Sequence, residues 1–266
     1  MSVMSKVAIV TGGNSGIGRC TAQALREAGC VVYDFSRREI PCDGVKYIKT
    51  DVTDEANVIE SVKAVVQNEG AIDIVINCAG FGISGAVEFT ELSEAKRQFD
   101  VNFFGMVNVN KAVIPYMREQ GNGRIINISS VAAVAHIPFQ TYYSASKAAT
   151  ESYTNALANE LRPFGVSVTA IEPGDICTGF TEARSKSFDG DDVYGGRISR
   201  SVSGMEKDEQ KGMSPEIAGK YITKIAMKKK VKPVYAIGFT YKILSALCKT
   251  FPCGFRNWVV GQMYGK

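Results

Sequence analysis

The sequence predicts an α/β fold in which one doubly wound, parallel sheet of seven strands has helices on both faces. Short apolar runs alternate with longer segments of helical periodicity along most of the 266 residues, which is typical of parallel strands joined by helices. The first run leads directly into a glycine-rich turn that opens a helix, a context typical of phosphate binding. No stretch rich in Pro, Gly and Ser divides the chain, so we expect residues 1–266 to form a single domain.

The expected strands are short runs that are largely apolar, because strands buried on both faces carry apolar side chains at most positions. They are expected at Lys6–Val10, Cys30–Ser36, Val45–Lys49, Asp73–Asn77, Gly123–Ile128, Val166–Ile171 and Val234–Ile237. Helices are expected between them at Arg19–Ala28, Glu55–Glu69, Ser93–Met117, Tyr142–Arg162 and Pro215–Met227. Ligands bind at the carboxyl ends of such strands, so the site is expected there.

The bulk composition argues against several classes of protein. A net charge of +4, from 31 basic and 27 acidic residues, is too small to indicate a nucleic-acid partner. No run approaches the roughly 20 apolar residues of a membrane span, and Val7–Val10 is too short for a signal peptide. The seven cysteines are scattered, and His136 is the only histidine. We therefore expect a reduced, cytoplasmic protein without a metal site.

The glycine-rich turn at Thr11–Gly18 reads T-G-G-N-S-G-I-G. Without side chains at these glycines, the backbone can approach a pyrophosphate, and the following helix offers its free N–H groups. The alternative is a tight turn that only packs the helix against the strand. The turn residues expected to contact a dinucleotide are Gly12, Asn14, Ser15, Gly16, Ile17 and Gly18.

The end of the second strand bears on the choice of cofactor. Ser36 is followed by Arg37 and Arg38, and a small neutral residue followed by arginine suits the 2′-phosphate of NADP(H). The alternatives are that the arginines are solvated loop charges, or that Asp34 contacts the ribose of NAD(H). We expect NADP(H) to be preferred.

The pair Tyr143 and Lys147 lies four residues apart in an expected helix, so both side chains share one face. A nearby cation favours phenolate, so we expect the pKa of Tyr143 to fall from roughly 10 towards neutrality. Such a phenol can act as a general acid or base. The alternative is a half-buried tyrosine beside a solvated lysine. Ser130 lies thirteen residues before Tyr143, at the end of an apolar run.

Two later segments have less regular patterns. Residues 179–212 are polar and rich in Gly and Ser, with weak periodicity, and are expected to form a mobile lid. The tail, about residues 239–266, is expected to place Phe239, Ile243, Leu244, Leu247 and Phe251 on one helical stripe. That stripe is expected in the core or a subunit interface, with a substrate wall or a membrane-surface helix as alternatives.

Six segments together resemble the classical short-chain dehydrogenase/reductase family, which has a Rossmann-like fold. They are T-G-G-N-S-G-I-G at 11–18, N-C-A-G at 77–80, the Asn102 segment, Ser130, Y-S-A-S-K at 143–147 and P-G-D-I-C-T at 173–178. The resemblance covers nearly the whole chain. It implies an NAD(P)-dependent oxidoreductase acting on alcohols or ketones.

The resemblance implies a role for each matching residue. Tyr143 is expected to exchange the proton with the substrate oxygen, Ser130 to polarise the carbonyl, and Lys147 to lower the Tyr143 pKa and bind the nicotinamide ribose. Asn102 is expected to hold a water in a proton relay; from the residues alone it is a core amide or a functional kink. Further cofactor contacts are expected from Asp51, Val52, Asn77, Ala79, Gly80, Pro173, Gly174, Ile176 and Thr178.

Within the family, the sequence looks most like hydroxysteroid dehydrogenases of the 17β type and the bacterial bile-acid branch. The alternatives are reduction of a 3-oxoacyl thioester, a retinoid or acyl-dihydroxyacetone phosphate, and a non-catalytic nucleotide sensor. Asp175 departs from the small or apolar residue of many relatives, and His136 is expected either in a substrate wall or in a surface loop. The resemblance also implies a homodimer or homotetramer.

Overall fold

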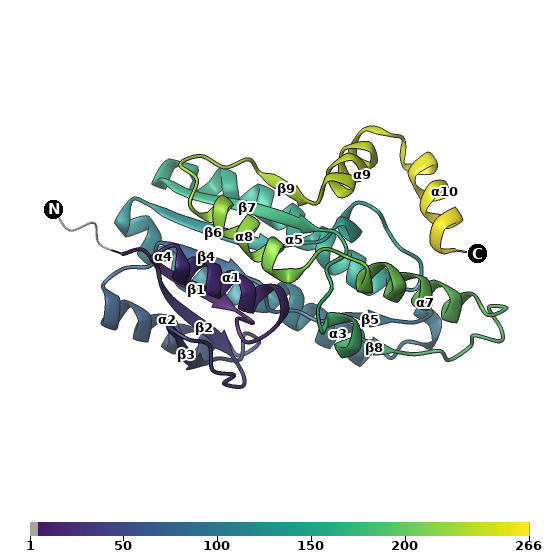
Figure 1. Cartoon of the computed structure of the whole chain (residues 1–266), viewed down its shortest axis with the longest axis horizontal. Coiled ribbons are helices and arrows are strands. Elements are labelled where there is room, and N and C mark those ends of the chain that lie inside the picture. The colour runs from purple at the N-terminus through teal and green to yellow at the C-terminus, as the bar shows by residue number, and fades with distance from the viewer. Residues whose placement is uncertain (1–4, 266) are drawn as a thin grey trace.

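The structure is a computed structural model that describes residues 5–265. Its centre is a seven-stranded parallel sheet with the order β3-β2-β1-β4-β6-β7-β9 (Figure 1). The strands are β1 Val7–Thr11, β2 Val31–Ser36, β3 Val45–Lys49, β4 Ile74–Asn77, β6 Gly123–Ile128, β7 Val166–Pro173 and β9 Val234–Ile237. The expected fold class is confirmed, and each expected strand is found with its ends shifted by two residues at most.

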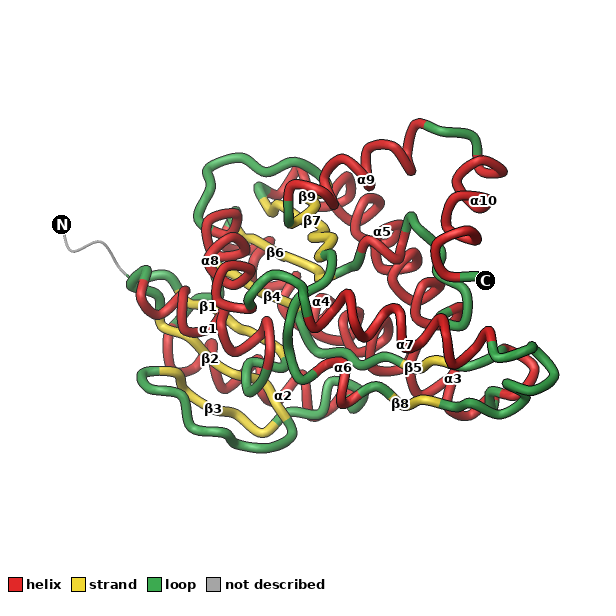
Figure 2. Tube along the Cα trace, turned by 45° about the vertical axis from the view of Figure 1, so that its right-hand side comes forward, coloured by secondary structure: helices red, strands yellow, loops and turns green. Residues whose placement is uncertain are grey.

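Helices cover both faces of the sheet, as Figure 2 shows in a second view. The helices are α1 Gly16–Glu27, α2 Glu55–Glu69, α3 Leu92–Phe99, α4 Gly105–Gln120, α5 Thr141–Leu161, α6 Phe180–Ala183, α7 Arg197–Gln210, α8 Pro215–Ala226, α9 Phe239–Thr250 and α10 Cys253–Tyr264. Short helical turns lie at Val87–Phe89, Asp100–Phe104, Val131–Ala133 and Arg162–Phe164.

The two faces of the sheet form separate cores because side chains alternate along each strand. In β1, Val7 and Ile9 pack with residues of α2, α4 and α5, whereas Ala8 and Val10 pack with α1 and α8. All five residues of β1 are buried. Burial on both faces therefore explains why β1 follows a continuous apolar run in the sequence.

The strand order reverses at β1, which pairs with β2 on one side and with β4 on the other. The loops that follow β1 and β4 therefore separate at this point, and such a switch point forms a crevice at the carboxyl edge of a sheet. The loops after β6 and β7 reach the same edge because all seven strands are parallel.

The segment expected as a weakly periodic lid has regular structure over much of its length. It contains α6, the strand β8 Ser185–Lys186 and the 14-residue helix α7. β8 pairs with β5 Ile83–Ser84 in a second, two-stranded sheet that the sequence did not predict. The expectation of weak periodicity was wrong for α7, since Ile198, Val202 and Met205 are buried together.

The C-terminal helices α9 and α10 lie beyond the edge of the sheet formed by β9 (Figure 1). Most of the stripe expected in the core is instead exposed: Phe239 is 81% exposed and Ile243 is 47% exposed, whereas Leu244 is half-buried. The buried residues of α9 are Ser245 and Cys248. A core role for the stripe was therefore wrong, because polar contacts of α9 with the sheet fix a different face inward.

Those polar contacts start from Glu172 in β7, a fully buried carboxylate. Glu172 accepts hydrogen bonds from Ser245 at 2.6 Å and from the ammonium of Lys249 at 2.7 Å. Lys249 also pairs with Glu151 of α5 at 3.2 Å. A buried carboxylate requires such partners, so these contacts set which side of α9 faces the sheet.

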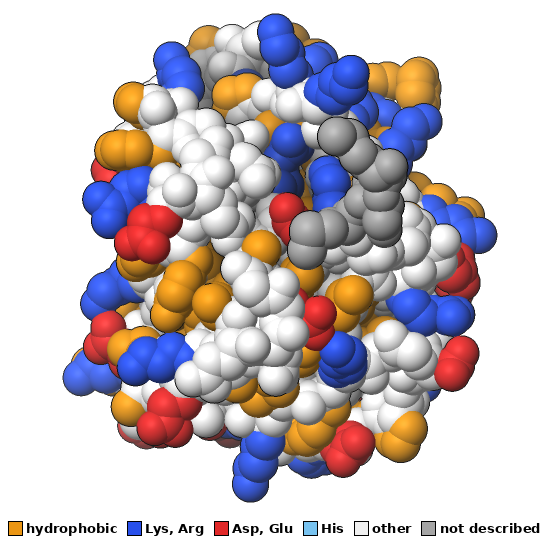
Figure 3. Space-filling view, turned by 90° about the vertical axis from the view of Figure 1, so that its left-hand side faces the viewer, with side chains coloured by type: hydrophobic (Ala, Val, Ile, Leu, Met, Phe, Trp, Pro, Cys, Tyr) orange, Lys and Arg blue, Asp and Glu red, His pale blue; other side chains and the backbone are white. Residues whose placement is uncertain are grey.

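Within residues 5–265, no helix has the length and hydropathy needed to cross a bilayer. On the face shown in Figure 3, basic and acidic side chains are interspersed over much of the surface.

Candidate active site

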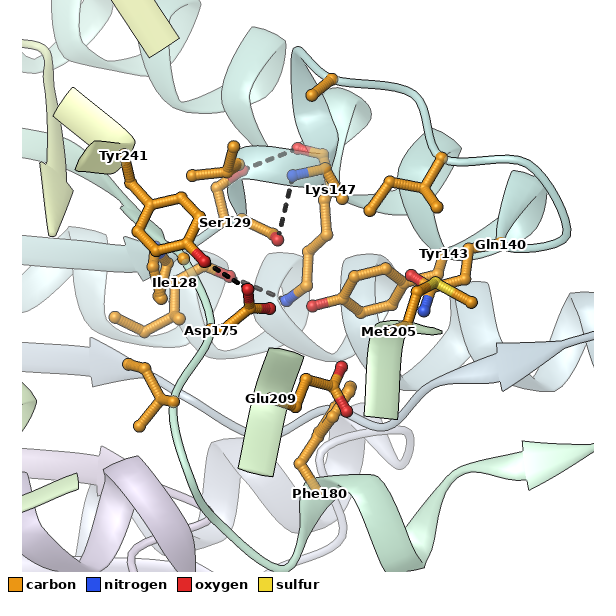
Figure 4. A pocket seen from close by; sticks show the side chains of 18 of the residues that line it. Ile128, Ser129, Gln140, Tyr143, Lys147, Asp175, Phe180, Met205, Glu209 and Tyr241 are labelled. Carbon is orange, nitrogen blue, oxygen red and sulfur yellow. Dashed lines mark hydrogen bonds between the residues drawn. The ribbon is translucent and has the colours of Figure 1, made fainter. Parts of the chain in front are cut away.

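A cavity of about 600 Å³ opens at the carboxyl edge of the sheet. Tyr143 and Lys147 reach it from the first two turns of α5, and Ser130 reaches it from the end of β6. Figure 4 shows Tyr143 and Lys147 with Asp175, Glu209 and Tyr241 around this cavity. The structure therefore brings together three residues that the sequence places in the expected catalytic group.

The ammonium of Lys147 is held at the end of β6. Its Nζ donates a hydrogen bond to the Ile128 carbonyl at 2.9 Å and lies 5.7 Å from the ring centroid of Tyr143. The next residue in the loop, Ser129, donates to the Lys147 carbonyl at 3.0 Å. Side chain and backbone of the lysine are thus fixed to one strand end. Lys147 is 7% exposed, so the alternative of a solvated lysine was wrong.

Asn102 lies where the long helix is interrupted by a π-helical turn at Asp100–Phe104. Its amide accepts from the Phe81 N–H at 3.0 Å and donates to the Phe81 carbonyl at 2.9 Å. Its side-chain oxygen would lie 3.1 Å from a Cβ at Gly80, and the Lys147 Nζ would lie 3.8 Å from the same point. Asn102 is therefore a satisfied core amide at a helix distortion, close to Lys147.

The glycine-rich turn fits a pyrophosphate. A Cβ at Gly18 would lie 2.2 Å from the Gly12 carbonyl oxygen, and Gly16 has a φ of +48°. Ser15 at the start of α1 makes no side-chain capping bond, and the first turn has no acidic residue. The N-terminal N–H groups of the helix are thus without a side-chain acceptor, as an anion site requires.

The residues expected to contact the adenosine part of the cofactor are divided between the cavity and a second, separate hollow. Arg38 lines the cavity and accepts a hydrogen bond from Asn14 through its carbonyl at 2.9 Å. Arg37 and Asp51 line a second hollow. The carboxylate of Asp51 accepts from the Thr53 hydroxyl at 2.7 Å.

Asp34 does not face the cavity. It is 4% exposed, accepts a hydrogen bond from Ser36 at 2.5 Å, and lies 2.7 Å from the Cβ position of Gly13. Its carboxylate is therefore enclosed beneath the glycine turn, which leaves little room for the ribose contact considered for NAD(H).

Most of the expected site residues line the cavity. They are Gly12, Ser15, Gly16, Ile17, Gly18, Arg38, Ala79, Gly80, Ser130, Tyr143, Lys147, Pro173, Gly174, Ile176 and Thr178. Outside its lining lie Asn14, Ser36, Arg37, Asp51, Val52, Asn77 and Asn102.

Two of the residues outside the lining, Asn77 and Val52, make contacts that join elements of the fold. The amide nitrogen of Asn77 donates to Asn110 at 2.7 Å and to Asn127 at 2.9 Å, so it joins two strands and α4. Val52 is buried, and its carbonyl accepts from Asn108 at 2.9 Å.

Several residues that line the cavity were not singled out one by one from the sequence. Phe180, Met205 and Glu209 come from the segment expected as a lid, and Tyr241 comes from α9. Their positions depend on how distant elements pack, so sequence spacing gave no signal for them. Leu244, Leu247 and Phe251 of the C-terminal stripe also line the cavity, in agreement with the substrate-wall alternative for that stripe. His136 is exposed and lies outside the cavity lining, and the substrate-wall alternative for it was therefore wrong.

A family model described as short chain dehydrogenase matches residues 6–188, more than half of the chain. The protein belongs to the short-chain dehydrogenase family. A 3-ketodihydrosphingosine reductase of Bacteroides thetaiotaomicron is 40% identical over 249 residues, which cover 92% of this chain and 93% of the relative. The probable short-chain type dehydrogenase/reductase VdlC of Helicobacter pylori is 32% identical, with 96% and 98% covered.

Solved structures of other short-chain dehydrogenases are similar over nearly the whole chain. A short-chain dehydrogenase from Streptomyces avermitilis has a TM-score of 0.84 and 29% identity, covering 98% of this chain and 96% of its own. The structure titled ElxO with NADP bound has a TM-score of 0.76 and 25% identity, covering 90% and 100%. None of these four proteins is named as a hydroxysteroid dehydrogenase, so they give the family and not that branch.

In this short-chain dehydrogenase, the pKa of Tyr143 shifts in the opposite direction to that expected from the sequence. Burial raises the pKa of Tyr143 to about 12, although a hydrogen bond with Ser130 opposes the rise. Burial also lowers the pKa of Lys147 to about 8. The expected fall in the Tyr143 pKa was therefore wrong for the protein alone, because desolvation disfavours the charged form of both groups. Tyr143 is a neutral phenol at neutral pH and can donate a proton.

Proposed function

We propose that this short-chain dehydrogenase is an NADP(H)-dependent reductase of long-chain ketones that carry an amine next to the carbonyl, as 3-ketodihydrosphingosine does. The observation that carries the proposal is the shape and lining of the cavity. Lys147 is buried beside Tyr143 in the cavity, whereas Leu247, Phe251 and Met263 in its lining are between 44% and 59% exposed. An apolar wall thus leads from the reacting groups to the surface, which suits a long alkyl chain.

The proposed reaction divides the work among three side chains. Ser130 and Tyr143 donate hydrogen bonds to the substrate carbonyl, and the Tyr143 phenol transfers its proton to that oxygen. When bound, the dinucleotide supplies the hydride that is added to the carbonyl carbon. Lys147, held by the Ile128 carbonyl at 2.9 Å, provides positive charge beside the phenolate that remains. After the reduction, the Lys147 ammonium is proposed to return a proton to the Tyr143 phenolate, and a water held by Asn102 is proposed to reprotonate Lys147.

NADP(H) is supported by charges at the end of β2. Arg37 and Arg38 follow the strand, and Asp34 is enclosed beneath Gly13. Arginine binds a phosphate with two parallel hydrogen bonds, so we propose that this pair selects the 2′-phosphate of NADP(H) over NAD(H). The other cofactor contacts expected from the sequence are retained as part of this proposal.

Further features of the predicted enzyme are also retained as proposals. We propose that residues 179–212 close over the substrate and that the protein is a cytoplasmic homodimer or homotetramer. Hydroxysteroid or bile-acid oxidation stays a prediction. The amino ketone is favoured over it because the Bacteroides relative, named for that reaction, matches almost the full length of both chains.

A substrate panel tests the proposal. NADPH consumption is measured with a medium-chain 2-amino-3-ketone, a ketosteroid, a 3-oxoacyl thioester and a retinal. We expect the highest kcat/KM with the amino ketone, and a higher value with a ketosteroid would contradict it.

Two tyrosine variants test the assignment of the proton donor. Tyr143→Phe is expected to lower kcat by about 10²–10⁴-fold, while leaving the Kd for NADPH within a factor of about three. The control is Tyr142→Phe, which removes the neighbouring phenol and should leave kcat near the wild-type value. Turnover retained by Tyr143→Phe would remove this residue from its role. NADPH binding without turnover of any substrate would instead support the nucleotide-sensor alternative.

A further inference from the structure

Asp175 places a carboxylate in the wall of the substrate cavity, immediately after Pro173 and Gly174. Two contacts from distant parts of the chain fix it. Its carbonyl accepts from the Met213 N–H at 2.9 Å, and its side chain accepts from the Tyr241 hydroxyl. Figure 4 shows this pair among the side chains of the cavity. The carboxylate is therefore held in one orientation before any ligand arrives.

The ring of Tyr241 is packed closely on the turn that carries Asp175. A Cβ at Gly174 would lie 2.1 Å from this ring, so glycine leaves the space that the ring occupies. Tyr241 belongs to α9, which Lys249 anchors to Glu172 at 2.7 Å. The C-terminal helix therefore presents a hydrogen-bond donor to Asp175 from a fixed position.

No ion pair neutralises Asp175 within residues 5–265. The neighbouring carboxylate of Glu209, also in the cavity lining, pairs with the buried guanidinium of Arg184 and accepts from Thr181 at 2.7 Å. Glu209 thus takes up the guanidinium of Arg184, and the Asp175 carboxylate has no ion-pair partner of its own among the described residues. Burial raises the pKa of the Asp175 carboxyl, while the hydrogen bond from Tyr241 opposes the rise.

A cation bound in the cavity would offset the unfavourable desolvation of the Asp175 carboxylate. A half-buried carboxylate whose side chain accepts only from a phenol has no ion-pair partner to offset its desolvation. A substrate ammonium supplies that charge and further N–H donors, and charge-assisted hydrogen bonds are stronger than neutral ones. A neutral ketone of the same length has no ammonium group and leaves the carboxylate without an ion-pair partner.

We propose that Asp175 binds the ammonium group of the substrate and selects amine-bearing ketones over ketones of the same length without an amine. This inference rests on the proposed function and names the residue that would set its substrate class. In the proposed amino ketone the amine is attached to the carbon next to the carbonyl. Binding of the ammonium by Asp175 would therefore help to position the carbonyl for Tyr143 and Ser130.

The test compares binding and turnover of two matched ligand pairs. The first pair is a medium-chain 2-amino-1,3-diol and the same diol without its amine, titrated by calorimetry into the protein with NADP bound. The second pair is the corresponding ketones, followed by NADPH consumption. We expect Asp175→Asn to weaken binding of the amino diol about ten- to a hundred-fold, and to leave binding of the plain diol unchanged. Unchanged diol binding also shows that the variant folds.

Asp43→Asn, which removes an exposed carboxylate elsewhere, is expected to change neither ligand's affinity. Equal losses for both diols, or no loss for either, in Asp175→Asn would overturn the role of Asp175. A wild-type preference for the amino diol that disappears in Asp175→Asn would support the inference even if no ketone were reduced, in which case the proposed reaction alone would fail. If the protein reduced ketones without any preference for the amine, the proposed ketone reduction would stand and the inference about Asp175 would be overturned.

Discussion

Replacing Lys249 by methionine should destabilise the protein, and the loss should grow as the pH rises. Lys249 lies between two carboxylates, Glu172 at 2.7 Å and Glu151 at 3.2 Å. Glu172 has a fully buried side chain, whereas that of Lys249 is 38% exposed. Removing one partner of a buried pair costs about 3–5 kcal/mol, and solvent screening of the exposed lysine reduces this to about 2–3 kcal/mol near pH 6.

The pH dependence follows from Glu151. Burial and the neighbouring Glu172 raise its pKa from 4.5 to about 7. Between these two values the folded state holds a proton that the unfolded state has lost, so stability falls as pH rises and levels off above the folded pKa. Without the ammonium, the pKa of Glu151 rises further, and the fall continues to higher pH. Each further pH unit costs up to about 1.4 kcal/mol.

Urea denaturation at pH 6 and pH 8 measures both effects. Lys249→Met is expected to lose about 2–3 kcal/mol at pH 6 and about 1 kcal/mol more at pH 8. The matched control is Lys242→Met on the same helix, which removes an exposed cation lying 5.1 Å from the ring centroid of Tyr221 and should cost under about 1 kcal/mol at both pH values. A loss for Lys249→Met that equals the control, or that shrinks at pH 8, would refute the reasoning.

Three further changes have expected outcomes. Arg37→Ala should raise the Kd for NADPH about 10–100-fold and leave that for NADH unchanged in titrations; equal effects on both would contradict the charge argument. Gly18→Ala would place a Cβ 2.2 Å from a backbone carbonyl oxygen and should abolish measurable NADPH binding, whereas Gly204→Ala in α7 has open space and should leave it intact. Phe251→Ala should raise KM several-fold for long-chain but not short-chain ketones, because this ring lines the cavity. The control Phe239→Ala, at a ring that is 81% exposed and outside the lining, should change neither KM, and equal losses in both variants would argue against an alkyl-chain wall.

The sequence alone was sufficient for the sheet and for the inner part of the site. Strands such as β1 are buried on both faces, so their apolar runs are continuous and easily recognised. The glycines at 12, 16 and 18 mark backbone positions where a side chain is excluded or φ is positive. Tyr143 and Lys147 meet because helical geometry brings residues four apart onto one face. These features are local, and local spacing determines them.

Only the tertiary structure decided the charges and the outer wall of the cavity. Asp175 and Tyr241 are 66 residues apart, and Glu209 reaches the cavity from α7, so no spacing rule connects them. The direction of the Tyr143 pKa shift also depended on packing, because desolvation outweighed the lysine one helical turn away. The orientation of α9 was set by Glu172, a buried carboxylate that Ser245 and Lys249 satisfy. Hydrophobic periodicity could not predict this orientation, because it does not indicate that Ser245 meets a buried carboxylate 73 residues away in the chain.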